Sequence, residues 1–113
     1  MKYPIALLVL VLAGCGQQAD ADRARLDTLL TNRPIDSVIL TSLRSTNVLT
    51  GPAAWKYVEA LSASNRLKGV SSKAQLDVWV SLMSGTNQVA QLSRYDTGDW
   101  EFGDFAFRLR SSP

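Results

Sequence analysis

The sequence contains no histidine and a single cysteine, Cys15. Without histidine, the chain lacks the general base that serine and cysteine hydrolases use. A zinc site would have no imidazole ligand and at most one thiolate, which is fewer than such sites need. One cysteine cannot form an internal disulfide, so the packing of the core has to hold the fold. These absences favour a binding function over an enzymatic one.

An excess of charge of one sign is also missing. The chain carries 12 basic and 10 acidic side chains, for a formal net charge of +2 at pH 7. Nucleic-acid-binding domains concentrate positive charge on one face, so we expect no nucleic-acid partner. The short basic stretch of Arg66, Lys68 and Lys73 is predicted to be solvated loop charge. Contact with anionic lipid or peptidoglycan is the alternative.

One long hydrophobic run is present, at residues 5–13 (IALLVLVLA), after the positive charge of Lys2. A transmembrane helix needs about 20 apolar residues, and this run is shorter. A basic start followed by an apolar stretch of this length is typical of a secretory signal. We therefore predict a signal peptide at residues 1–14 that is removed from the mature protein.

The residues at the end of this run, Leu12-Ala13-Gly14-Cys15, resemble the lipobox of bacterial lipoproteins. The resemblance covers residues 1–15. It implies that a signal peptidase cuts before Cys15 and that the Cys15 sulfur carries a diacylglycerol. It also implies that the new amino group carries an N-acyl chain. Palmitate-like chains contribute about 0.8 kcal/mol per buried methylene, so several of them anchor the protein to the membrane permanently.

The residue after the cysteine is Gly16 rather than an aspartate. In lipoproteins of Gram-negative bacteria, an aspartate at that position is associated with retention in the inner membrane. The resemblance therefore implies a lipid-anchored protein of the cell envelope, on the periplasmic face of the outer membrane.

The chain from Cys15 onward is predicted to have two parts. Residues 15–34 comprise the lipidated cysteine, a flexible tether of small polar residues at 16–22 and a possible short helix at 23–31. An early strand is the alternative to that helix. Residues 35–113 are predicted to form one small domain.

Hydrophobic periodicity predicts the elements of this domain. We expect strands at 35–43, 75–83 and 88–95, a loop at 45–49, a helix at 53–66 that starts after Thr50-Gly51-Pro52, and an aromatic segment at 100–110. A bulge or tight turn at Gly103-Asp104 puts the aromatic residues of the last segment on the core side.

The predicted fold class is α+β, with one main helix packed on an antiparallel sheet of about four strands, in two layers. This layout resembles that of small uncharacterised bacterial lipoproteins. The likeness is one of pattern and implies no activity.

A hairpin turn at Gly85-Thr86 predicts the register of the two central strands. It places Leu76 opposite Tyr95 and Trp79 opposite Leu92.

This register places Trp79, Met83 and Leu92 together on the open face of the sheet. Exposed apolar patches mark partner sites, and tryptophan is frequent among the residues that dominate binding. These three side chains are therefore the candidate partner-binding residues. In the alternative, an N-terminal segment covers this face and Trp79 belongs to the core; its apolar residues are Leu26, Leu29 and Leu30.

Four acidic residues lie close together in the sequence: Asp96, Asp99, Glu101 and Asp104. We expect solvated carboxylates in turns, because their spacing does not match the EF-hand loop. They are weak candidates for a calcium site or for a small hydrolase. Asp96-Thr97-Gly98 matches the tripeptide of aspartic proteases, but Arg94 and Tyr95 stand where that family has apolar residues.

The sequence as a whole predicts a membrane-anchored periplasmic lipoprotein that is no enzyme and uses no metal or cofactor besides its lipid. It is expected to be a binding or envelope-structural module whose partner is an envelope protein or peptidoglycan. A serine–lysine catalytic pair stays open, although no motif indicates one. The alternatives are an inhibitor or immunity protein against a secreted hydrolase, and a calcium-binding protein or small hydrolase that uses residues 96–104.

Overall fold

The computed structural model describes residues 14–32 and 34–113, and for Gly14, Cys15 and Gly16 it describes the backbone alone. The predicted signal peptide, apart from Gly14, lies outside the described residues. The elements in chain order are α2 (Gly14–Asn32), β1 (Ser37–Thr41), β2 (Thr46–Thr50), α3 (Gly51–Leu61), β3 (Ser64–Leu67), β4 (Leu76–Ser84), β5 (Asn87–Tyr95), β6 (Trp100–Phe102) and β7 (Phe105–Leu109).

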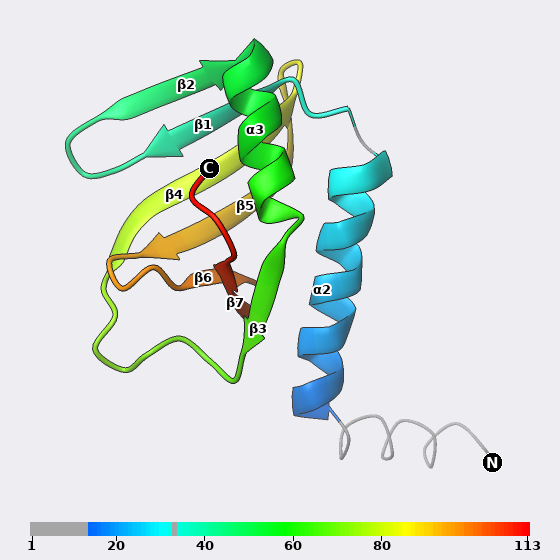
Figure 1. Cartoon of the computed structure of the whole chain (residues 1–113), viewed down its shortest axis with the longest axis vertical. Helices are drawn as coiled ribbons and strands as arrows, with labels where there is room; N and C mark the ends of the chain where they lie inside the picture. The colour runs from blue at the N-terminus through cyan, green and yellow to red at the C-terminus, as the bar shows by residue number, and fades with distance from the viewer. Residues whose placement is uncertain (1–13, 33) are drawn as a thin grey trace.

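The strands form one antiparallel sheet with the order β2-β1-β4-β5-β6-β7-β3. β1 and β2 are a hairpin, and β4 to β7 are a meander. α3 leads from β2 at one edge of the sheet to β3 at the other, and residues 68–75 lead back to β4 in the middle (Figure 1). Both helices contribute to the same core cluster, so they lie against the same face of the sheet.

The predicted fold class is wrong, because the sheet has seven strands instead of about four and two helices pack on it. Two of the additional strands come from segments for which we predicted another structure. Thr46–Thr50 forms β2 where a loop was expected, and Ser64–Leu67 forms β3 where the helix was expected to continue. Both are edge strands that bury few side chains, so neither has the hydrophobic alternation that identifies a strand from sequence. Pairing with β1 and β7 decides their structure.

α3 starts where the cap and the proline predict, with Thr50 at the N-cap and Pro52 in the first turn. It ends at Leu61, earlier than predicted. The chain then turns into β3, and the carbonyl of Ala63 accepts a hydrogen bond from the backbone N–H of Arg110. Sheet pairing therefore ends the helix here, before its predicted end at residue 66.

Residues 16–22 are helical, so the prediction of a flexible tether is wrong. They belong to α2, and the alanines and glutamines of this stretch are good helix formers. Two side chains of this part of α2, Ala19 and Asp22, are buried. Contact with the domain therefore orders a segment whose small polar residues suggested flexibility.

The second half of α2 packs on the core. Leu26 is 1% exposed, and Leu29 and Leu30 pack against the core cluster that also includes α3. The N-terminal helix therefore covers the same face of the sheet as α3. The alternative in which these leucines cover the face of Trp79 is wrong.

The aromatic part of the core comes from the β6–β7 hairpin. This hairpin reverses at Gly103, which has a φ of +59°, so that Phe102 lies opposite Phe105. The tight turn predicted there is confirmed. The aromatic side chains of the hairpin are buried and Leu109 packs against the same cluster; the buried residues are Trp100, Phe102, Phe105 and Phe107.

The β4–β5 hairpin follows the predicted register only at its two ends. Between these ends the pairing is shifted by one residue, because Val89 in β5 and Asp77 in β4 are bulged and the second bulge restores the register. The pairs that agree with the prediction are Ser84 with Asn87, Met83 with Gln88, and Leu76 with Tyr95. Relative to the predicted register, the two bulges thus exchange the faces of the β5 residues from Ala90 to Arg94.

α2 is joined to the β6–β7 turn by a buried carboxylate. Asp22 is 5% exposed, and its Oδ2 accepts a hydrogen bond of 2.8 Å from the backbone N–H of Asp104. A Cβ atom at Gly103 would lie 2.5 Å from the same oxygen. Gly103 therefore serves two purposes, because it provides a positive φ and leaves room for the Asp22 side chain.

We expect Gly103→Ala to lower the free energy of unfolding by about 3 kcal/mol. About 1 kcal/mol comes from the left-handed backbone, and the rest comes from displacing the buried Asp22 carboxylate and leaving the Asp104 N–H without its acceptor. The matched control is Gly85→Ala, which has a φ of +60° and nothing within 4 Å of the added Cβ. Urea denaturation of both variants measures the difference, and equal losses would show that Asp22 does not depend on this turn.

Candidate functional site

The face of the sheet opposite the helices carries an apolar group formed by Ile39, Val48, Trp79 and Met83, which we call the open-face patch. Ile39 pairs with Val48 across β1 and β2, and Trp79 and Met83 pair with the ends of β1. Side chains alternate between the faces of a strand, and each of these four has a sequence neighbour that packs in or against the core; these neighbours are Val38, Leu49, Val80 and Leu82. Val48 is 59% exposed and the other three are half-buried. No helix covers this face within residues 14–32 and 34–113.

The structure brings together two of the three predicted partner-binding residues. Trp79 and Met83 share the open face, as the alternation in β4 predicts. Leu92 does not belong to the patch, because the bulge at Val89 places it opposite Val80, where it is 1% exposed in the core. The prediction that Leu92 joins Trp79 on the open face is therefore wrong.

Ile39 and Val48 belong to the patch but were not among the predicted site residues. Ile39 lies in the predicted strand 35–43, and assigning its face would have required the position of that strand beside β4. Val48 lies in a segment predicted as a loop. The three β-branched residues Thr46, Val48 and Thr50 among five are the weak signal that could have indicated a strand there.

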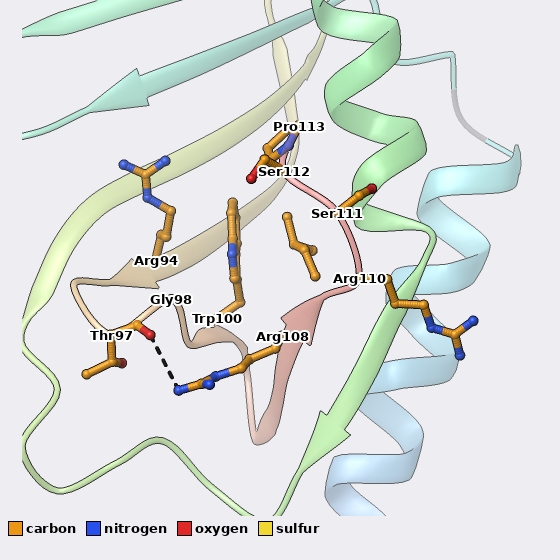
Figure 2. Close-up of a pocket in the computed structure, with 10 residues that line it drawn as sticks. Arg94, Thr97, Gly98, Trp100, Arg108, Arg110, Ser111, Ser112 and Pro113 are labelled. Carbon is orange, nitrogen blue, oxygen red and sulfur yellow. Dashed lines mark hydrogen bonds between the residues drawn. The ribbon is translucent and has the colours of Figure 1, made fainter.

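A second candidate is a concavity of about 410 Å³ on the helix side of the sheet, lined by Arg94, Thr97, Gly98, Trp100, Arg108, Leu109, Arg110 and residues 111–113. Three arginines around one hollow suggest an anion site. Figure 2 shows, however, that the Arg108 side chain turns toward Thr97 and that Arg110 points away from the hollow. Their guanidinium groups bond to the Thr97 carbonyl at 3.4 Å and to the Asn65 side chain at 3.1 Å. The Arg94 guanidinium lies 3.7 Å from the Asp77 carboxylate. Each of the three arginines therefore has a partner within the protein, and they do not converge on a ligand.

A tyrosine packs beside this concavity. The Tyr57 ring lies edge-on to Trp100, with 6.0 Å between the ring centroids. Its hydroxyl is buried and has no hydrogen-bond partner among the described residues. Burial raises the pKa of Tyr57 above its ordinary value, so the hydroxyl stays protonated at neutral pH and does not provide a base.

The four acidic residues of the predicted turn cluster do not share a site. Asp96 accepts a hydrogen bond from the backbone N–H of Gln75 at 2.9 Å, and Glu101 accepts one from the Tyr95 hydroxyl at 3.0 Å. Asp104 is exposed, and Asp99 is buried in a separate contact. In the part of the chain that the structure describes, no three such side chains are grouped as metal ligands. The geometry gives no support to a calcium site at these residues.

Asp99 links the loop before β4, at residues 68–75, to β7. It is 2% exposed, and its carboxylate accepts hydrogen bonds from the Ser71 backbone N–H at 3.0 Å and from Arg108 Nε at 2.7 Å. The hydrogen bond from Ser71, followed by that from Arg108, lowers the pKa of Asp99 below its ordinary value. Asp99 is therefore a structural carboxylate that stabilises the fold in its charged form.

The sign of this pKa shift predicts a pH dependence. Because the pKa of Asp99 is lower in the folded state, its stabilising effect is present above the unfolded pKa of about 4 and is lost as the pH falls through the folded value. We expect Asp99→Asn to lower the free energy of unfolding at pH 7 and to flatten its decrease between pH 5 and pH 2. The control is Asp104→Asn, which removes the same charge from an exposed side chain. Urea unfolding at several pH values gives both profiles, and parallel profiles for Asp99→Asn and the unaltered chain would contradict this role.

Comparisons of the chain with protein-family models, with curated proteins and with solved structures found no match. Neither helix of the described residues combines the length and the hydropathy that crossing a membrane requires.

Proposed function

We propose that this protein is a lipid-anchored lipoprotein on the periplasmic face of the outer membrane, and that it binds another envelope component without catalysis. The observation that carries the proposal is the one-sided sheet. Both helices pack on one face, and the other face carries a half-buried tryptophan in an apolar group. An exposed apolar patch on a small domain marks a protein–protein contact, and tryptophan often dominates the binding energy of such contacts.

The lipobox and the single cysteine support the anchor. Cys15 has no cysteine partner in the chain, and lipidation converts a thiol that would be reactive outside the cytoplasm into a membrane attachment. The alternative of an inhibitor or immunity protein uses the same kind of surface, and no feature of the described residues favours it over the general binding function.

We expect Cys15→Ser to abolish acyl labelling of the protein in cells fed a palmitate analogue, because serine has no thiol to form the thioether. The matched control is Gly14→Ala, which keeps a small residue before the cysteine and should be labelled like the unaltered chain. Labelling and membrane fractionation are measured together. Labelling that persists in Cys15→Ser would rule out the anchor.

The binding function is tested with a photo-crosslinking amino acid at position 79 in the full-length protein inside cells. We expect one discrete adduct with a different protein or with peptidoglycan, because the probe replaces the tryptophan of the open-face patch. The control position is Lys56, an exposed residue of α3 on the other side of the molecule. Equal adducts from both positions, or none from position 79 in a folded protein, would reject the open face as the binding surface.

A further inference from the structure

The two edges of the sheet differ in how they are protected. An exposed edge strand is a template for pairing with another chain unless charges, proline, a bulge or a covering element prevents it. At the β3 edge, Arg66 forms an ion pair with Asp20 of α2, and α2 lies along this side of the sheet (Figure 1). β2, at the opposite edge, has the sequence TNVLT, without charge or proline, and pairs residue for residue with β1 without a bulge. All of its residues except Leu49 are exposed.

The hydrogen-bonding pattern shows which groups of β2 face outward. Ser42 N–H donates to the Ser45 carbonyl at 2.9 Å, so these two residues form a hydrogen-bonded pair at the hairpin end. Hydrogen-bonded and non-hydrogen-bonded pairs alternate along an antiparallel ladder. Asn47 and Leu49 therefore bond to β1. The backbone N–H and C=O groups of the remaining β2 residues point away from the sheet; these are Thr46, Val48 and Thr50.

We propose that this edge pairs in antiparallel fashion with the β2 of a second copy of the chain, with Val48 at the two-fold axis. Thr46, Val48 and Thr50 are symmetric about Val48 in both spacing and residue type. Centring the pair there sets Val48 opposite the other copy's Val48, and Thr46 opposite the other copy's Thr50. Every outward-facing residue then has a hydrogen-bonding counterpart. The Thr50 carbonyl also serves the first turn of α3 as the N-cap, so the strongest bonds are those of Val48 and of the Thr50 N–H.

Two exposed apolar side chains lie at the same edge. Among the described residues, the large hydrophobic side chains that are exposed are Leu43, Val48, Trp55 and Leu76. Leu43 is at the tip of the β1–β2 turn, Val48 is in β2, and Trp55 is in α3, which begins directly after β2. In the symmetric pair, the Leu43 turn of each copy lies beside the start of the other copy's α3. Leu43 and Val48 therefore lie along the proposed seam, and the start of α3, one turn before Trp55, lies at its end.

The helices leave room for this pairing. α3 begins at the end of β2 and runs back across its own sheet, away from the edge (Figure 1). Because the two β2 strands are antiparallel, the two α3 helices start at opposite ends of the seam. The open faces of the two sheets join, and Ile39 and Val48 of both copies form one row of β-branched side chains, an arrangement that stabilises strand pairs.

The test uses the full-length chain with Val48→Cys, in cell lysate oxidised with copper phenanthroline. Opposed residues of a hydrogen-bonded pair have Cα atoms about 5.5 Å apart, within the range that a disulfide spans. We expect most of the chain to run as a disulfide dimer on a non-reducing gel. The controls are the unaltered chain, which reports any dimer formed through Cys15, and Thr86→Cys at the exposed tip of the β4–β5 hairpin. Both should give at least about tenfold less dimer, since they have no opposed thiol in reach.

The register has its own test. Thr46→Cys and Thr50→Cys should each fail to cross-link alone, because the strand rise of about 3.4 Å per residue puts each about 14 Å from its own counterpart. The double variant Thr46→Cys/Thr50→Cys should cross-link, since these positions oppose one another. In this double variant, Val48→Lys should abolish the dimer by placing two ammonium groups together, and Val48→Ile should preserve it.

Three outcomes would overturn the inference. They are equal dimer from Thr86→Cys and Val48→Cys, cross-linking of Thr46→Cys alone, and an adduct of Val48→Cys with a different protein. The lipid anchor plays no part in the test, because the unaltered chain accounts for Cys15 whether or not it is acylated.

Discussion

The reversal of the chain at Gly103 is the constraint on which the rest of the fold depends. It sets the aromatic residues of β6 and β7 on one face, where the Phe105 and Phe107 rings stack with 4.8 Å between their centroids. Both helices attach to this group. Tyr57 of α3 contacts Trp100, and the guanidinium of Arg25 in α2 lies over Phe102 at 4.7 Å. One short hairpin thus provides the core surface for two segments that lie far from it in the sequence, and the buried Asp22 holds α2 to its turn.

The parts of the fold that could be predicted from the sequence are those that bury a regular pattern. β4 alternates buried aliphatic residues with less buried ones from Val78 to Met83, and α3 has a cap and a proline at its start, so β4 and the start of α3 were located with small errors. β2 and β3 bury too little to leave a pattern, because edge strands gain their order from a neighbour. The helical residues 16–22 were mistaken for a tether because their contacts, such as that between Asp22 and Asp104, span most of the chain.

Two of the four residues of the open-face patch could be predicted from the sequence, for a related reason. Alternation within β4 is enough to put Trp79 and Met83 on one face. The position of Leu92 depends on a bulge at Val89, which no local residue preference announces. A shift of one residue moves a side chain from one face to the other, so an error in a single bulge exchanges a core residue for a surface residue. Ile39 and Val48 could be assigned to the patch only after the order of the strands was known.

The continuous helix from Gly14 to Asn32 limits where a lipidated form of this protein can act. At a rise of about 1.5 Å per residue, the path from Cys15 to the first buried side chain, Ala19, is about 6 Å long. If Cys15 carries the proposed lipid, a domain held this close to it cannot reach far from the bilayer, and its partners have to lie next to that bilayer. In a pair joined at β2, the two α2 helices lie at the outer ends of the extended sheet, because α2 contacts β5, β6 and β7 rather than β2. For both lipids to enter one membrane, the joined sheet has to lie parallel to the membrane surface. The two-fold axis of the pair is then perpendicular to that membrane.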